Sequence, residues 1–247
     1  MAKSSERVDL STYTSFMKHH WVELLTEKFE KDFIRAKVCL EQLYDHLNEI
    51  NLEYQNQMNR TLFTTLDGRI KSKKSFFVKL YGKCKNKVKS EGFSQENLQK
   101  WYGEITDLAG MRFSTPYYDE VDIAITQYIR PHLGRYGYGT DLNSLGLVDK
   151  NYLDEGDENG YRSYHFFVKV PTPVDIYGTV ENVICEIQGR SELQHVWAVK
   201  SHDLLYKPKK GWKNPTRDQL SDMKQLSESL RSVDHFLVKI RKSVRKK

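Results

Sequence analysis

Apolar side chains recur every three or four positions along the first part of the chain. Residues 13–58 contain neither Gly nor Pro. The recurring positions are Phe29, Phe33, Ala36, Leu40, Leu43, Leu47 and Ile50. Because residues at this spacing share one face of an α-helix, the pattern predicts a long amphipathic helical region. Gly68 punctuates the chain before a second predicted helix over residues 71–89, and a third helix is expected before Asp107.

Short strands alternate with helices in the middle of the chain. Residues 110–115 read as a strand that Pro116 ends, residues 119–129 as a helix, and residues 163–170 and 180–188 as two neighbouring strands. Helical spacing returns after Glu192, and residues 218–242 form a closing amphipathic helix. The sequence therefore predicts an α/β fold with helical ends. Residues 149–159 are expected to form a flexible surface loop.

Composition narrows the class of protein. The chain has 247 residues, of which 38% are apolar, which suffices for one substantial core with helical flanks. Lys and Arg exceed Asp and Glu by 39 to 33, and the net charge of +6 favours a polyanionic partner. Residues 239–247 are expected to form a solvated basic terminus.

The cysteines and the hydropathy indicate the cellular compartment of the protein. Cys39, Cys84 and Cys185 show no paired spacing, so they predict neither a disulfide framework nor a zinc site. The first residues lack the hydrophobic core of a signal peptide, and no apolar run approaches the length of a membrane span. We therefore expect a soluble protein of the reducing cytoplasm, without a membrane partner.

A first group of cations surrounds the start of the second predicted helix. Lys71, Ser75 and Lys79 are spaced by four, so they are expected to share one helical face. Arg69 stands at the predicted helix entrance, where a guanidinium can stack on a base and free backbone amides favour anions. Such a stripe can hold phosphates. The alternative is a lysine-rich face that only contacts solvent.

Two further groups combine acids with arginines. Asp107 comes directly before a predicted strand and Arg112 lies inside it, as expected if the carboxylate binds a hard cation. Glu186, Gln188 and Arg190 alternate with apolar residues, so a strand would direct them to one face. An exposed strand face is the simpler explanation. The apolar residues just before Glu186 favour a buried strand, where a carboxylate needs a partner or a metal.

The loop that enters the strand at residues 163–170 carries aromatic and polar groups. Tyr161 supplies a ring for stacking, Arg162 and His165 supply phosphate ligands, and Ser163 supplies a donor. A tyrosine beside a strand is otherwise a packing residue. His202 lies later, on the predicted helix that follows Glu192.

His202 shares a helical face with His195 and Tyr206 by spacing. Two histidines without a third ligand more often make core or anion contacts than hold a metal. We therefore predict no zinc there.

The order of these motifs resembles the synthetase domain of the RelA/SpoT family, especially its small single-domain members. The motifs are Gly-Arg-Ile-Lys at 68–71 with Ser75 and Lys79, Asp-Leu-Ala-Gly-Met-Arg at 107–112, Lys-Asn-Tyr-Leu at 150–153, Gly-Tyr-Arg-Ser-Tyr-His at 160–165, Glu-Ile-Gln at 186–188, and Trp197 to Tyr206 and Lys207. Several ordered motifs are more specific than any one of them. The likeness covers about residues 68–207. It suggests an N-terminal helical region over 1–67, a synthetase core over 68–212 and a C-terminal basic helix over 213–247.

The resemblance implies a nucleotidyltransferase-like mixed sheet flanked by helices. It also implies transfer of the β,γ-pyrophosphate of ATP to the 3′-hydroxyl of GDP or GTP, which makes the alarmone (p)ppGpp. Only helices are predicted on either side of the core, so a dedicated synthetase without hydrolase or regulatory modules is expected. Positioning, a metal ion and fixed cations stabilise such a transfer, and no covalent nucleophile is needed.

Roles follow from the resemblance position by position. The adenine of ATP would lie between Arg69 and Arg112, and its phosphates would contact Lys71, Ser75 and Lys79. A Mg²⁺ ion would be held by Asp107 and Glu186. Glu186, helped by Gln188, would take the 3′ proton. The acceptor would contact Lys150, Tyr161, Arg162, Ser163, His165, Arg190 and His202.

The acceptor half departs from the family's pattern. Many members carry Pro-Lys where this chain has Gly156 and Asp157, which exchanges a cation for an anion. Val148 stands where some carry an arginine, Gly189 replaces the usual isoleucine, and Ser201 replaces a glutamate common among small synthetases. A weaker grip on free GDP is one consequence that these changes suggest.

Three other functions therefore stay open. Toxin-like branches of the family pyrophosphorylate the 3′ end of tRNA, and the basic balance suits that acceptor. A further relative class uses adenosine nucleotides. From a different class, the chain would be an inert RNA-binding module. A homo-oligomer is compatible with the resemblance, since small members often assemble through terminal helices, and a neutralising partner is expected only for a toxin.

Overall fold

The computed structural model describes residues 9–173, 178–206 and 214–244. Its helices are α1 (Tyr13–Met17), α2 (His20–Met58), α3 (Lys73–Glu91), α4 (Gln95–Gly103), α5 (Asp119–Ile123), α6 (Arg130–Arg135), α7 (Glu192–Ser201) and α8 (Arg217–Val244), with shorter helical turns η1 (Ala124–Ile129), η2 (Asn143–Leu145) and η3 (His202–Tyr206). Its strands are β1 (Thr65–Ile70), β2 (Ala109–Thr115), β3 (Lys150–Asn151), β4 (Tyr164–Pro173) and β5 (Val180–Ser191). Lys207 of the last motif and residues 245–247 of the basic terminus lie outside the described residues.

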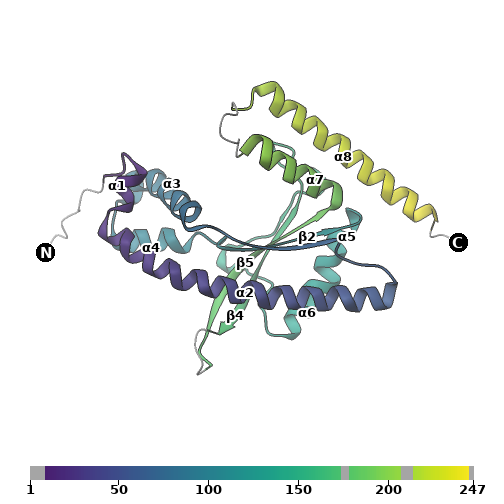
Figure 1. Ribbon diagram of the computed structural model, residues 1–247, viewed down its shortest axis with the longest axis horizontal. Helices are drawn as coiled ribbons and strands as arrows, with labels where there is room; N and C mark the ends of the chain where they lie inside the picture. The colour runs from purple at the N-terminus through teal and green to yellow at the C-terminus, as the bar shows by residue number, and fades with distance from the viewer. Residues whose placement is uncertain (1–8, 174–177, 207–213, 245–247) are drawn as a thin grey trace. The chain divides into compact units, whose positions relative to one another are not determined.

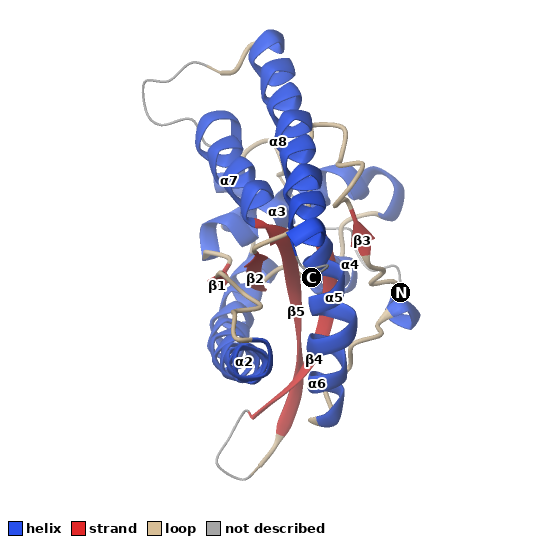
Figure 2. Cartoon of the chain, turned by 90° about the vertical axis from the view of Figure 1, so that its right-hand side faces the viewer, coloured by secondary structure: helices blue, strands red, loops and turns tan. Residues whose placement is uncertain are grey.

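The strands form one five-stranded sheet in the order β1-β2-β5-β4-β3, and Figure 2 shows the strands among the helices. β3 pairs antiparallel with β4, with Lys150 opposite His165. A mixed sheet flanked by helices confirms the predicted fold class. The expectation that the two strands of the central motifs are neighbours is also confirmed, because β5 pairs with β4.

By its internal contacts the chain divides into two units, each built from separate stretches of sequence. The first unit comprises residues 1–41, 69–110 and 170–185. In it α1, α3 and α4 gather beside the N-terminal half of α2 (Figure 1). Their apolar faces meet in one core, which is why α3 stays helical despite its many lysines. Its largest fully buried side chains are Phe16, Phe29, Phe76, Phe77, Leu80, Leu98 and Trp101.

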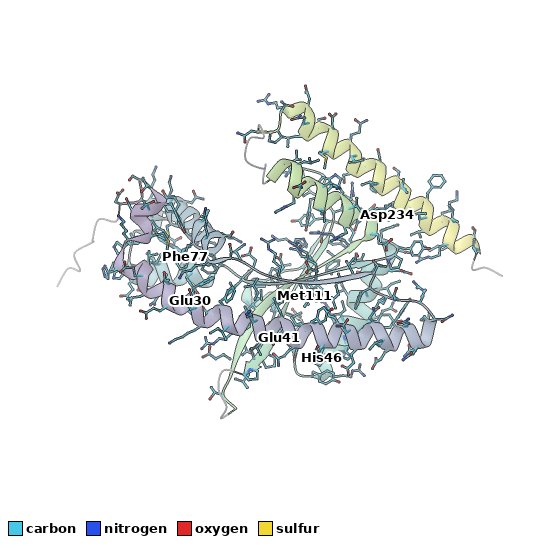
Figure 3. All side chains as sticks on the ribbon, viewed as in Figure 1. Glu30, Glu41, His46, Phe77, Met111 and Asp234 are labelled. Atoms are coloured by element: carbon cyan, nitrogen blue, oxygen red, sulfur yellow. The ribbon has the colours of Figure 1, made fainter. Side chains whose placement is uncertain are left out.

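The second unit comprises residues 42–68, 111–169 and 186–247. Figures 1 and 2 both show α7 and α8 side by side. Ser191, which caps α7, donates a 2.6 Å hydrogen bond to Asp234 of α8, the residue labelled in Figure 3. Near the C-terminal end of α8, Arg241 pairs with Asp119 at 2.6 Å. Arg241 is therefore anchored, which corrects the expectation of a solvated basic terminus at this position.

Two local expectations were wrong. Gly68 does lie between two helices, α2 and α3, but within a strand, β1, that was not predicted. Helix α3 begins after Ser72, whose hydroxyl accepts from the backbone amide of Ser75 and so caps the helix. Lys71 therefore precedes the helix and does not share a helical face with Ser75, and Arg69 lies on β1 rather than at the helix entrance.

The segment at residues 149–159 is more ordered than a surface loop. It begins with β3, and backbone hydrogen bonds tie Tyr152 to Ser163 and Asp157 to Tyr161. These bonds fold the segment back on the start of β4. Within the described residues, no helix has the length and apolar character needed to cross a membrane.

Candidate functional site

In the first unit, two lysines converge on Asp107. Lys71 Nζ lies 2.5 Å from Asp107 Oδ2, and Lys79 Nζ lies 3.0 Å from Oδ1. The two lysines reach Asp107 from different parts of the chain. Lys71 is held beside it by a hydrogen bond from its backbone amide to the carbonyl of Leu108, and Lys79 extends from α3. We call these three residues the aspartate–lysine cluster.

The positive charges of the two lysines keep the carboxyl group of Asp107 ionised. Burial raises the pKa of Asp107, but hydrogen bonds and charge attraction from Lys71 and Lys79 outweigh it, so the pKa lies below its usual value. The carboxylate is therefore ionised at neutral pH. Oδ1 is buried and forms a 3.0 Å ion pair with Lys79, so a metal ion bound there would take the place of this lysine. The Lys79 side chain is 45% exposed and can turn toward an anion from solvent.

In the second unit, the polar residues of β5 meet around Gln188. Its Oε1 accepts from Arg112 Nε at 3.2 Å and from Arg190 Nη2 at 3.0 Å, while its Nε2 donates to Glu186 Oε2 at 3.1 Å. The predicted alternation is confirmed, since Cys185 and Ile187 are fully buried on the opposite face. A single amide thus orients two guanidinium groups and one carboxylate.

The same residues close into a ring with His165 of β4 and Tyr161 of the loop before it. Glu186 Oε1 lies 2.9 Å from His165 Nδ1, and His165 Nε2 lies 2.8 Å from the Tyr161 hydroxyl. Arg190 donates to that hydroxyl and stacks over the Tyr161 ring at 4.9 Å. We call Glu186, His165, Tyr161, Arg190 and Gln188 the β4–β5 network.

Donor chemistry assigns the protons of the β4–β5 network. Arg190 can only donate, so the Tyr161 oxygen accepts from it and the Tyr161 proton points to His165 Nε2. His165 then carries its proton on Nδ1 and donates it to Glu186. Two donors, His165 and Gln188, therefore hold the Glu186 carboxylate in a fixed orientation.

His195, on α7, belongs to the surroundings of this network. Burial, followed by the positive charges of Arg190 and Arg112, lowers the pKa of His195. The ring is therefore neutral near pH 7 and adds no charge beside the two arginines.

The loop before β4 is shaped by Asp157. Its Oδ1 accepts from the backbone amides of Asn159 and Tyr161, both at 2.8 Å. Gly160 has φ of +88°, and a Cβ there would lie 3.1 Å from Ser227. The acid that stands where many relatives carry a cation therefore holds the backbone of Tyr161 in place.

Arg162 and Ser163 lie in the interior of the second unit. Arg162 is 3% exposed, donates to Ser227 at 3.2 Å and pairs with Glu228 at 2.7 Å. Ser163 is fully buried and donates to the carbonyl of Gly189 at 3.1 Å. These contacts give both side chains a role in holding the loop against α8 and β5. Their role in acceptor binding stays a prediction.

The other predicted residues lie at accessible positions. Arg69 is exposed on β1, and Ser75 is half-buried in the first turn of α3. Lys150 is exposed on β3 opposite His165, which puts a cation beside the β4–β5 network. His202 is exposed at the C-terminal cap of α7.

The predicted site residues thus fall into two sets. Arg69, Lys71, Ser75, Lys79 and Asp107 belong to the first unit, whereas Arg112, Lys150, Tyr161, Arg162, Ser163, His165, Glu186, Gln188, Arg190 and His202 belong to the second. Within each unit the central residues come together. The pairing of Asp107 with Glu186 on one metal ion joins the two sets and stays a prediction.

Known proteins with similar sequences share one activity in their names. GTP pyrophosphokinase YwaC of Bacillus subtilis is 25% identical over 225 residues, which cover 90% of this chain and 95% of the relative. GTP pyrophosphokinase YjbM of the same organism is 22% identical over 182 residues, which cover 73% of this chain and 74% of the relative.

Solved structures show the same fold. Small alarmone synthetase 1 from Bacillus subtilis, bound to its product pppGpp, superposes with a TM-score of 0.67 at 22% identity over 89% of this chain and 100% of that one. A GTP pyrophosphokinase family protein from Streptococcus pneumoniae gives a TM-score of 0.64 at 20% identity over 90% of this chain and 97% of its own. The family model described as the region found in RelA / SpoT proteins matches residues 68–211, more than half of the chain. The chain therefore belongs to the RelA/SpoT family.

Proposed function

We propose that the protein is a pyrophosphokinase that transfers the β,γ-pyrophosphate of ATP to the 3′-hydroxyl of GDP or GTP and so makes (p)ppGpp. The β4–β5 network is the observation that carries this proposal, because it fixes a carboxylate beside an aromatic ring and two arginines. The names of the relatives, GTP pyrophosphokinases, support the same reaction.

ATP is assigned to the first unit's cations together with Arg112. Lys71 and Lys79 offer positive charge to its phosphates, and Ser75 adds a hydroxyl near the amide groups at the start of α3. The guanidinium groups of Arg69 and Arg112 stack on the adenine. Lys79 is the residue we expect to leave Asp107 for a phosphate, since its side chain is the more exposed of the two lysines.

The acceptor is assigned to the β4–β5 network. Tyr161 stacks on its base, and Lys150, His165 and Arg190 contact its phosphates. Because Asp157 holds the amide of Tyr161, the position of the ring depends on a residue that departs from the family's pattern. His202, Arg162 and Ser163 complete the acceptor side in this proposal.

The transfer step balances without a covalent enzyme intermediate. Glu186 accepts the proton of the 3′-hydroxyl while the 3′-oxygen bonds to the β-phosphorus of ATP. The bond from that phosphorus to the oxygen bridging the α-phosphate breaks, and AMP leaves. Gln188 and His165 keep the Glu186 carboxylate aimed during the step. Lys71 and Lys79, the cations assigned to the ATP phosphates, offset the negative charge that develops on the phosphoryl oxygens.

Asp107 and Glu186 are the residues we propose to hold Mg²⁺. Carboxylate oxygens are the protein ligands that Mg²⁺ prefers, and the neighbouring lysines keep Asp107 ionised. A bound Mg²⁺ would neutralise charge on the triphosphate. The two lysines beside Asp107 are competitors that the ion must displace in part.

The test supplies labelled donor to separate acceptors. Purified protein with Mg²⁺ and ATP labelled in the γ-phosphate is incubated with GDP, GTP, ATP or deacylated tRNA. We expect label on the guanosine nucleotides and equimolar AMP. Label on tRNA would instead favour the toxin-type reaction. Label on an adenosine acceptor would favour an enzyme that uses adenosine nucleotides as acceptors. No label on any acceptor would reject the enzyme in favour of an inert module.

A further inference from the structure

Outside the residues used so far, one group of side chains in the second unit has the composition of a transition-metal site. His46 and Glu49 lie on α2, where a separation of three puts them on one helical face. Figure 3 shows His46 on the lower side of α2 in that view. His132 reaches the same point from α6. We call these three residues the His–Glu–His cluster.

The distances within the cluster fit a tetrahedral ion. His46 Nδ1 lies 3.2 Å from His132 Nε2 and 3.5 Å from Glu49 Oε2, and the last two atoms lie 3.4 Å apart. Metal–ligand bonds of about 2.0–2.1 Å in tetrahedral zinc sites place neighbouring ligand atoms about 3.3–3.4 Å apart. Hydrogen bonds to nitrogen are usually about 2.7–3.2 Å long. The two contacts of Glu49 are therefore long for hydrogen bonds but match the edges of a metal tetrahedron.

The donor set selects the class of ion. We propose that the His–Glu–His cluster binds a divalent transition-metal ion of the zinc type, with a fourth position open to water. Imidazole nitrogen favours such ions, whereas Mg²⁺ prefers oxygen ligands only. Among the described residues, this is the one group of three or more such side chains whose ligand atoms converge.

The surroundings of the cluster hold its rings and leave an entry path. The ring of His46 packs against those of Tyr136 and Tyr138, with centroids 4.3 Å and 5.3 Å away. The His132 side chain is 4% exposed, whereas that of Glu49 is 52% exposed. An ion can arrive from solvent on the side of Glu49.

Arg135 competes with the metal. Its Nη2 lies 3.2 Å from His132 Nδ1, and since arginine only donates, this contact keeps the ring proton on Nε2. A metal at Nε2 requires the proton on Nδ1, so Arg135 must turn away when the ion binds. Arg135 is exposed and can do so. Removing Arg135 should therefore tighten metal binding, which a cluster held only by hydrogen bonds would not show.

The full chain, without an affinity tag, is first treated with chelator to remove bound metal. Co²⁺ is then titrated into it in the presence of excess Mg²⁺, which occupies carboxylate sites. We expect one Co²⁺ per chain with the intense visible absorption of four-coordinate cobalt, displaced by Zn²⁺. His132→Ala should weaken binding by at least about 100-fold, because loss of even an outer partner of a ligand costs about 10–100-fold. Glu49→Gln, at an exposed position, tests the third ligand without risk to the core. Arg135→Ala should bind more tightly.

His235→Ala is the matched control, because His235 lies on α8 against Tyr118 and Asp154, away from the cluster. Its Co²⁺ binding should equal that of the unaltered protein. Absence of saturable Co²⁺ binding would overturn the proposal, as would binding that survives both Glu49→Gln and His132→Ala. None of these variants alters a residue assigned to pyrophosphate transfer, so a negative result leaves the proposed function standing.

Discussion

Replacement of Gly189 by alanine should destabilise the protein through overpacking. The new Cβ would lie 2.5 Å from Phe113 Cζ and 2.8 Å from Val121 Cγ1. Carbon atoms pack best at about 3.5–4.0 Å, so the methyl group is about 1 Å too close on two sides. Phe113 and Val121 are buried and cannot move into solvent. Gly189 therefore lies on the core face of β5, and its departure from the family's isoleucine concerns packing.

The magnitude follows from two opposing effects. Overpacking a core costs about 1–3 kcal/mol, and replacing glycine in a strand returns about 0.5–1 kcal/mol of backbone entropy. The free energy of unfolding should fall by about 1–2 kcal/mol, which lowers Tm by roughly 2–8 °C for a chain of this length. Gly189→Ile should cost more. Part of its cost should be recovered when Phe113→Ala makes room, with a coupling of about 0.5–3 kcal/mol.

The assay is urea unfolding followed by circular dichroism, with thermal melts in parallel. Gly82→Ala is the control, because it replaces a glycine inside α3 whose Cβ would meet nothing within 4 Å. That variant should gain about 0.5–1 kcal/mol from helix propensity. The reasoning is refuted if Gly189→Ala is as stable as the unaltered protein, or if Gly189→Ile and Phe113→Ala prove additive.

Three further outcomes are expected. Asp107→Asn should lower pyrophosphate transfer by at least about 100-fold with unchanged circular dichroism, and full activity would remove Asp107 from the mechanism. Tyr161→Ala should raise the KM for the acceptor by about 10–100-fold, which corresponds to the loss of stacking on one base, and should leave the KM for ATP unchanged. Equal effects on both KM values would show that the ring does not bind the acceptor base. Burial, opposed by the hydrogen bond from Ser191, raises the pKa of Asp234 from 3.8 to about 6, so its protonation stabilises the native state. The contribution of Asp234 to the free energy of unfolding should therefore fall by roughly 3 kcal/mol as pH rises from about 4 to about 6. The difference in stability between the unaltered protein and Asp234→Asn should change by that amount over this range; a difference independent of pH would contradict the shift.

Strong periodicity made most of the fold predictable from the sequence. The long helix α2, the strands β4 and β5 and the closing helix α8 each repeat apolar residues at one clear spacing, and each was found. The expected helix over residues 13–58 is interrupted once, between α1 and α2. β1 was missed because its sequence, Thr65–Ile70, contains Asp and Gly and has an almost wholly exposed pattern. Two-residue strands such as β3 leave no periodic signal.

The candidate site was predictable where it follows a strand and unpredictable where it depends on tertiary contacts. Alternation placed Glu186, Gln188 and Arg190 on one face of β5, and the structure confirms it. No spacing in the sequence shows that Lys71 would meet Asp107, because the contact comes from the backbone pairing beside β2. The helical face assumed for Lys71 was wrong because Ser72 caps the helix, which begins at Lys73, two residues later than predicted.

Some functional candidates had a sequence signal that was too local to interpret. His46 and Glu49 have the spacing of neighbours on a helix, but their third partner, His132, lies on a distant helix. Asp157 stands in a loop rich in turn residues, where an Asp commonly accepts from backbone amides two residues on. Its contact with the amide of Tyr161 explains why an acid is useful at that position.

Sharing of one metal ion between Asp107 and Glu186 is the claim on which the proposed reaction depends. The direct measurement counts Mn²⁺ bound per chain by electron paramagnetic resonance, in the presence of a nonhydrolysable ATP analogue. The unaltered protein should hold a tightly bound Mn²⁺ that Asp107→Asn and Glu186→Gln each remove, with no further loss in the double variant. Retention of that ion at full affinity in either single variant would contradict the shared site.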